Sequence, residues 1–220
     1  MRVERSVLAP ALSLALAVGI FGVSFGVLAA SAGLSLPQAS AMSLLVFTGS
    51  AQYAAVAAAA AGAAMPAVVL TGLLLNTRCV AFGVALAPVI GGRWSHRLLG
   101  AQLIIDESTA LAMAEEDPAR ARAAFWMTGL AVFGCWNAAT VAGALAQSAL
   151  GDPRRLGLDA VFPAAFVALL VPMVRRRSHL AAALAGAAVA VSAVPFAPAG
   201  VPITLGALGA LAGVAAERRA

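Results

Sequence analysis

An uncharged stretch near the N-terminus most constrains what this chain can fold into. From Ser6 to Thr77, 72 consecutive residues include no Lys, Arg, Asp, Glu or His. Because about 20 apolar residues span the roughly 30 Å hydrocarbon core of a bilayer, this stretch has room for more than two crossings. A water-soluble domain usually carries about a quarter charged residues, whereas the whole chain carries 10%. The sequence therefore predicts an integral membrane protein.

Apolar runs and the residues that interrupt them divide the chain into predicted segments. They are Val7 to Ala32, Ala39 to Ala61, Ala67 to Ile90, Leu98 to Ala114, Ala123 to Leu150, Val161 to Val174, Leu180 to Val194 and Val201 to Ala216. A polar stretch at 115–122 separates two halves of one transmembrane domain, residues 1–220. The predicted fold class is all-α: a polytopic membrane bundle with seven or eight hydrophobic segments, some of them broken or re-entrant.

The distribution of charge supports the same prediction. The chain has fourteen Arg and no Lys, and all the Arg residues except Arg78 stand in small groups between the apolar segments, as topology determinants do. If every segment crosses, both termini are cytoplasmic and nine Arg lie inside against four outside. If 98–114 is re-entrant, one terminus changes side. We expect a multi-pass plasma-membrane protein with cytoplasmic termini. Nucleic-acid binding is not expected, because no basic face carries interleaved aromatic residues.

Charged residues interrupt two of the apolar segments at positions that would lie within the bilayer. Arg78 is near the middle of 67–90 and needs an anion, which a buried carboxylate or a substrate carboxylate could supply. Asp106 and Glu107 could neutralise Arg78, meet the ammonium group of a substrate, or carry a coupling proton. The alternative for all three is a structural Arg–carboxylate pair.

Uncharged polar residues interrupt a third segment. The stretch from Phe47 to Tyr53 places Thr, Gly, Ser and Gln inside an apolar run. A helix break there would expose backbone groups that can bind a solute. Ser50, Gln52 and Asn76 would then line the path with hydrogen bonds. The alternative is a kinked helix in which Gln52 simply bonds a neighbouring helix.

Catalysis is not expected from this sequence. The histidines, His96 and His179, lie in Arg-flanked loops, and no three-ligand metal set can be assembled. Glu115 to Arg120 fits the short motif EExxxR, which resembles the first motif of CAAX-type intramembrane proteases, but those proteins also need membrane-embedded histidines. Because the chain has no Lys, it has no Walker A loop. We predict neither an enzyme nor a bound cofactor or metal.

At the same polar groups the chain resembles the AzlC family of branched-chain amino-acid permeases. The resemblance is carried by Gly22 to Gly26, Phe47 to Tyr53, Leu75 to Arg78 and Asp106 to Ser108, with residues 157–164 similar to a later family segment. It covers most of residues 7–175. One position departs, since the family usually has His where this chain has Cys79. If that His handles protons in the family, this protein couples differently or not at all.

The resemblance implies a function and a partner. It implies an exporter of branched-chain amino acids such as valine, working with a small hydrophobic AzlD-type membrane subunit. Under this hypothesis Arg78 holds the substrate carboxylate, and Asp106 or Glu107 meets the ammonium group or a proton. Two other hypotheses stay open: a passive channel for a small polar solute, and a non-transporting membrane scaffold protein.

Overall fold

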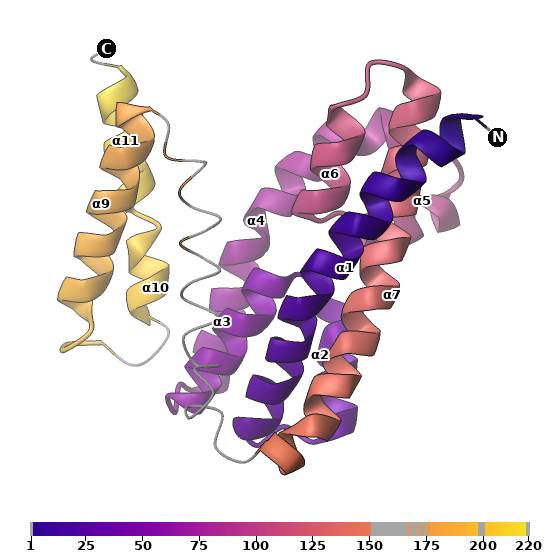
Figure 1. Cartoon of the computed structure of the whole chain (residues 1–220). Coiled ribbons are helices and arrows are strands. Elements are labelled where there is room, and N and C mark those ends of the chain that lie inside the picture. Colours follow the sequence, from indigo (N-terminus) through magenta and orange to yellow (C-terminus); the bar gives the residue numbers. More distant parts are fainter. Residues whose placement is uncertain are drawn as a thin grey trace.

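The computed structural model is a set of helices packed side by side (Figure 1). It describes residues 2–150, 167, 171, 174, 176–197 and 201–218. No strand occurs in these residues, which confirms the all-α prediction. The predicted segment Val161 to Val174 lies outside the described residues, apart from three single positions.

Among the described residues, three helices contain stretches long and apolar enough to cross a membrane: α1 (Arg2–Ser31), α4 (Met65–Ile90) and α7 (Pro118–Leu150). α1 and α7 run parallel and approach closely through glycines. A Cβ on Gly26 would collide with the Thr140 carbonyl oxygen, and one on Gly143 with that of Val23. Lipid tails are as apolar as Leu, so membrane helices associate where small residues allow such contact.

The second predicted segment is broken and folds back on itself. α2 (Leu36–Val46) has 11 residues and α3 (Gly49–Ala60) has 12, so each is too short to span a bilayer. The Gln52 side chain of α3 donates from Nε2 to the Met42 carbonyl oxygen of α2 at 3.0 Å. α2 and α3 therefore form a hairpin, here called hairpin A (residues 36–60), which the chain enters and leaves at the same end of the bundle.

The tip of hairpin A depends on an unusual backbone conformation. Phe47 has φ 35°, in the left-handed region. The left-handed conformation costs a non-glycine residue roughly 1–2 kcal/mol. Burial of the Phe47 ring against Phe133 of α7, with ring centroids 4.8 Å apart, offsets this penalty. Packing thus holds the sharp reversal that local preference opposes.

The fourth predicted segment also folds back. α5 (Trp94–Gln102) has 9 residues and α6 (Asp106–Met113) has 8, and together they form hairpin B (residues 94–113). Arg122, in the first turns of α7, donates from Nε to the Val89 carbonyl oxygen near the end of α4 at 3.0 Å. Hairpin B therefore begins and ends at one end of the bundle. The segment 98–114 therefore folds back on itself, as in the re-entrant alternative, and differs from the topology in which every segment crosses.

The two hairpins enter from opposite ends, and their tips meet in the middle. Gln102 of hairpin B donates from Nε2 to the Leu44 carbonyl oxygen of hairpin A at 2.8 Å. The buried Ser108 hydroxyl shapes the tip of hairpin B, since it donates to the Leu103 carbonyl oxygen at 2.6 Å and accepts from the Ile105 N–H at 3.2 Å. A long helix followed by a hairpin thus occurs twice with opposite orientation: α1 with hairpin A, and α4 with hairpin B.

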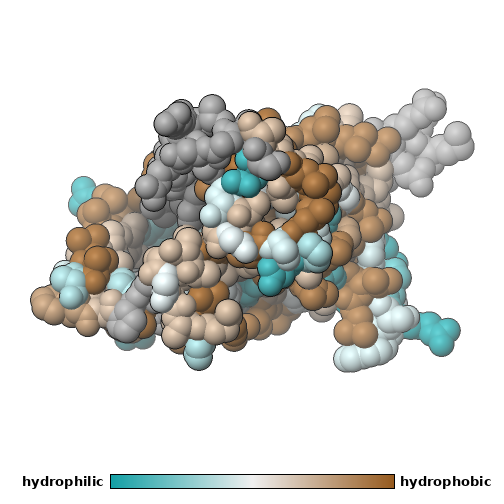
Figure 2. Space-filling model, turned by 90° about the horizontal axis from the view of Figure 1, so that it is seen from below, coloured by the Kyte–Doolittle hydropathy of each residue, from teal (hydrophilic) through white to brown (hydrophobic). Residues whose placement is uncertain are grey.

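This arrangement gathers charge at one end of the bundle. The starts of α1 and α7 and the open end of hairpin B lie there together, and they carry Arg2, Arg5, Arg93, Arg97, Arg120 and Arg122. The turns at the opposite end, residues 32–35 and 61–64, carry no charged residue. Figure 2 shows that opposite end, where apolar residues cover most of the described surface. Arg93 and Arg97 lie at the same end as Arg120 and Arg122, contrary to the all-crossing topology.

The described residues from 176 onward form three helices: α9 (Arg177–Ala193), α10 (Val201–Gly206) and α11 (Gly209–Glu217). The predicted segment Val201 to Ala216 is divided by a turn at 207–208. α9 packs against the other two through small residues, and a Cβ on Gly206 would lie 3.1 Å from the Gly186 carbonyl oxygen. Both termini lie at the top of Figure 1.

Candidate functional site

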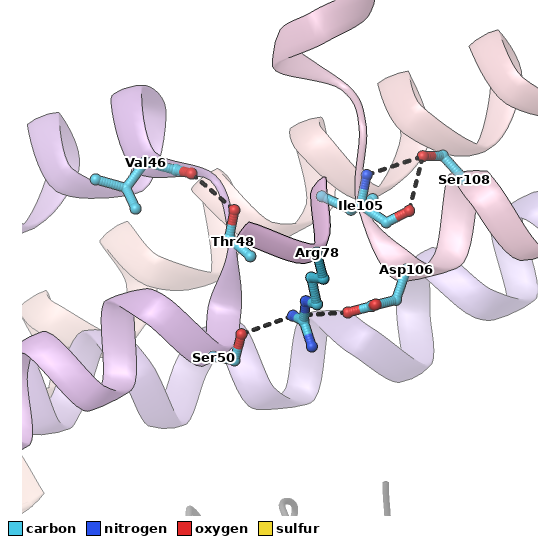
Figure 3. A network of polar contacts seen from close by, with 7 residues as sticks. All are labelled: Val46, Thr48, Ser50, Arg78, Ile105, Asp106 and Ser108. Atoms are coloured by element: carbon cyan, nitrogen blue, oxygen red, sulfur yellow. Dashed lines mark hydrogen bonds and ion pairs between the residues drawn. The ribbon is translucent and has the colours of Figure 1, made fainter. Parts of the chain in front are cut away.

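Arg78 joins the tips of the two hairpins. It is near the middle of α4, which runs from Met65 to Ile90. Its Nη2 atom lies 2.8 Å from Oδ2 of Asp106 and donates to Oγ of Ser50 at 2.7 Å (Figure 3). The sequence-based expectation that a carboxylate of the fourth segment neutralises Arg78 therefore has a direct geometric counterpart.

The local fold explains why these side chains converge. Ser50 is the second residue of α3 and Asp106 is the first residue of α6, so both stand at helix N-termini. Backbone N–H groups in the first turn of a helix lack intrahelical partners and carry partial positive charge. With Arg78 between them, the two N-termini create a region that favours negative groups. Asp106 supplies one negative group, and the space beside it can hold a second.

A cavity of about 550 Å³ opens beside the Arg78–Asp106 pair. Its volume lies within the usual range for small-molecule sites. Polar groups on its wall come from Thr48, Ser50, Tyr53, Arg78, Asp106 and Glu107. Most of the remaining wall is apolar, from Leu14, Ala17, Val18, Phe21, Phe47, Ile105, Ala110, Val132 and Trp136. The cavity thus has one charged region in an otherwise apolar lining.

The ion pair keeps binding capacity on its cavity side. The side chains of Arg78 and Asp106 are 36% and 43% exposed. Nε of Arg78 is buried and has no hydrogen-bond partner in the described part of the chain. The exposed part of the guanidinium carries further N–H groups, and guanidinium N–H groups form strong hydrogen bonds with carboxylates. The pair can therefore accept a ligand carboxylate without losing every existing contact.

Two predicted site residues lie outside the cavity lining. Gln52 is fully buried; it donates to the Met42 carbonyl oxygen, and its Oε1 accepts from the Trp136 indole N–H at 2.9 Å. This matches the alternative in which Gln52 bonds neighbouring helices. Asn76 does not line the cavity, and its Oδ1 has no partner in the described residues. The structure brings together Ser50, Arg78, Asp106 and Glu107.

Sequence reasoning missed the apolar part of the site. Val132 and Trp136 of α7 line the cavity, and so do Leu14, Val18 and Phe21 of α1. Their spacing along each helix, three or four residues, indicates one helix face. Nothing in the sequence says which of several apolar faces meets the charged residues, because the pairing of α1 with α7 is a tertiary contact.

The residues considered for catalysis lie away from the cavity. Arg120 forms a local ion pair with Glu115, with Nε 2.7 Å from Oε2, and His96 packs on the Trp126 ring. Within the described ranges, no group of three or more His, Cys, Asp or Glu side chains could hold a metal ion.

Comparison with known proteins agrees with this architecture. A family model described as "AzlC protein" matches residues 13–150, which include both hairpins and all the cavity-lining residues. An "Uncharacterized membrane protein" of Archaeoglobus fulgidus is 30% identical over 173 residues, covering 77% of this chain and 74% of that protein. No solved structure matches. The family match covers more than half of the chain and the relative is a membrane protein, so this chain is a membrane protein with a transport-related role and belongs to the AzlC family.

Proposed function

We propose that this protein exports branched-chain amino acids such as valine, as a secondary-active carrier working with a small hydrophobic AzlD-type subunit. The observation that carries the proposal is the Arg78–Asp106 pair, 2.8 Å apart, in the wall of a mainly apolar cavity. An amino acid has one negative group, one positive group and, in valine, an apolar side chain. The cavity presents a complement to each.

Binding proceeds by exchange of partners within the ion pair. The substrate carboxylate binds the exposed part of the Arg78 guanidinium and lies near the N-terminus of α3, while the ammonium group binds Asp106 and Glu107. The branched side chain lies against the apolar wall. A zwitterion leaves no unpaired charge behind, and an unpaired charge inside a membrane is expensive. This favours an amino acid over a simple anion or cation.

The two oppositely oriented hairpins suit a carrier. In many transporters, repeats of inverted orientation place broken helices at a substrate site near the midplane, and rocking of one repeat against the other gives alternating access. Here Arg78 touches both hairpin tips, so a substrate that replaces Asp106 or Ser50 as its partner loosens the link between them. Glu107 is the proposed site of a coupling proton. The end with six Arg residues faces the cytoplasm of the plasma membrane.

Efflux from loaded cells tests the proposed function. Cells that express the protein and its partner are loaded with a valine-containing dipeptide, and valine release is compared for wild type, Arg78→Ala and Asp106→Asn. We expect both variants to fall toward the level of cells without the protein. Arg97→Ala and Glu116→Gln are matched controls, because both side chains are exposed at the basic end and outside the cavity. Unchanged efflux in both cavity variants would overturn the proposal.

Counterflow separates a carrier from a channel. Vesicles preloaded with unlabelled valine are diluted into labelled valine. A carrier gives transient accumulation of label, because exchange is tied to one binding site. Label that only equilibrates, with flux linear in concentration, would favour the passive channel.

A further inference from the structure

Trp136 lies next to the charged end of the cavity. It lines the cavity although it is only 5% exposed. The Cη2 edge of its indole lies over Gly49, where a Cβ would approach to 2.9 Å. Gly49 precedes Ser50, whose hydroxyl accepts a hydrogen bond from Arg78. The indole edge therefore lies over the residue that directly precedes the Arg78 partner Ser50.

The indole is held on several sides. Its N–H donates to Oε1 of Gln52 at 2.9 Å, and Gln52 is itself fixed to the Met42 carbonyl oxygen. The Phe25 ring stacks against it with centroids 6.2 Å apart, and the Tyr53 ring meets it edge-on at 6.4 Å. A ring with a buried hydrogen bond and aromatic neighbours cannot turn aside without losing these contacts. Trp136 thus presents a rigid wall.

We infer that Trp136 sets the upper size of the substrate side chain, and that Gln52 and Gly49 position its indole. This inference rests on the proposed function. A ligand whose carboxylate and ammonium groups are held by Arg78 and Asp106 has a fixed Cα, so its side chain can extend only as far as the nearest rigid surface. The indole edge over Gly49, the residue before Ser50, is such a surface in the cavity wall. Branched aliphatic side chains contact it, and aromatic side chains collide with it.

Substitution of Trp136 tests the size limit. Counterflow of labelled valine and labelled phenylalanine is measured in vesicles for wild type, Trp136→Phe and Trp136→Leu. Since one methylene in an apolar pocket changes selectivity by about 10–200-fold, we expect the phenylalanine-to-valine ratio to rise at least about tenfold. Trp126→Phe is the matched control, because Trp126 lies on the same helix, outside the cavity lining, and its indole nitrogen has no partner in the described residues. Its ratio should stay at the wild-type value.

The roles of Gln52 and Gly49 are tested by the direction in which their variants change the transport ratio, and by combining Gln52→Leu with a Trp136 variant. Gln52→Leu frees the indole and should raise the same ratio by about threefold, less than removal of the ring. In a Trp136→Phe background it should add nothing, since Phe has no N–H for Gln52 to hold. Gly49→Ala places a Cβ 2.9 Å from Cη2 of the indole, so it pushes the indole away from Gly49 and should also raise the phenylalanine-to-valine ratio. A purely structural defect would lower all amino acids equally and leave the ratios unchanged.

Ligand-induced thermal stabilisation by valine and phenylalanine gives the same ratios for any variant that binds without transporting. A phenylalanine-to-valine ratio unchanged in both Trp136 variants, with valine transport or binding retained, would overturn the inference and leave the proposed function intact. Absence of amino-acid counterflow and binding in wild type with its partner would overturn both.

Discussion

Hairpins A and B occupy matching places at opposite ends of the bundle, but most of their polar side chains differ in role. Those of hairpin A mainly bond neighbouring helices, whereas those at the start of α6 in hairpin B line the cavity. In hairpin A, Gln52 and Ser43 are fully buried, and the Ser43 hydroxyl bonds Thr140 of α7 at 3.2 Å. In hairpin B, Asp106 and Glu107 face the cavity, and Asp106 is nearly half exposed. A polar residue at membrane depth can thus hold the fold or face a ligand, and its burial and partners tell the two apart.

The hairpins also differ in how firmly they are packed. In hairpin A, α3 has buried side chains along most of its length and α2 buries two residues; in hairpin B, α5 buries Gly100 alone and α6 buries three residues. Elements with few buried apolar contacts open at lower free energy. We therefore expect hairpin A to be the fixed wall of the cavity and hairpin B to be the more easily displaced one.

The largest expected effect is on the stability of hairpin A. Gln52→Leu removes the side-chain hydrogen bond to the Met42 carbonyl oxygen of α2 and leaves the buried Trp136 N–H without its partner. Because a buried unsatisfied group costs about 1–3 kcal/mol, the free energy of unfolding should fall by about 2–4 kcal/mol. Thermal or denaturant unfolding in detergent measures the loss. Glu107→Gln in hairpin B should lose far less, and equal losses would break the comparison.

The next effect concerns the charged pair that links the hairpins. In the double variant Arg78→Met with Asp106→Leu, valine efflux should fall by about a hundredfold, or about 2.7 kcal/mol. Stability should change by only about 1 kcal/mol, because a pair replaced by apolar residues leaves no unpaired charge. Efflux and unfolding are measured on the same preparations. Retained efflux would show that the pair is a scaffold contact.

A smaller and more selective effect is expected at Glu107. If it carries the coupling proton, Glu107→Gln should abolish the accumulation of valine driven by an imposed pH gradient, which one proton sets at about tenfold for each pH unit. Exchange of valine for valine across equal pH should change little. Glu116→Gln is the control, since Glu116 is exposed near the start of α7. Gradient-driven accumulation that survives Glu107→Gln would assign coupling to another group.

The smallest effect is expected where the tips touch. Gln102→Ala removes the hydrogen bond to the Leu44 carbonyl oxygen at a partly open position. Its loss should lower the free energy of unfolding by about 0.5–1 kcal/mol. Unfolding of the Gln102→Ala and Gln52→Leu variants, measured under the same conditions, shows which substitution lowers the stability more. A loss from Gln102→Ala larger than that from Gln52→Leu would reverse the roles assigned to the hairpins.

Much of this protein followed from its sequence alone. The uncharged run from Ser6 to Thr77 dictates insertion into a bilayer, because no soluble fold could bury it. The stretch from Phe47 to Tyr53 marked a helix break, since Gly and Ser loosen a helix inside an apolar run. A charged Arg78 within the bilayer needs a nearby anion, and the sequence offered Asp106 and Glu107 as the two candidate carboxylates. These inferences depend only on the transfer free energy of side chains and on local backbone preference.

The tertiary structure decided the rest. Hydropathy measures whether a segment is apolar and cannot tell whether a helix of 11 residues continues or reverses after its break. The reversal depends on the left-handed Phe47 and on its ring packing against Phe133. Whether Gln52 faces a ligand or a helix depended on Trp136, 84 residues away. Contacts between residues so distant in the chain arise only when the helices pack, so composition and spacing could not specify them.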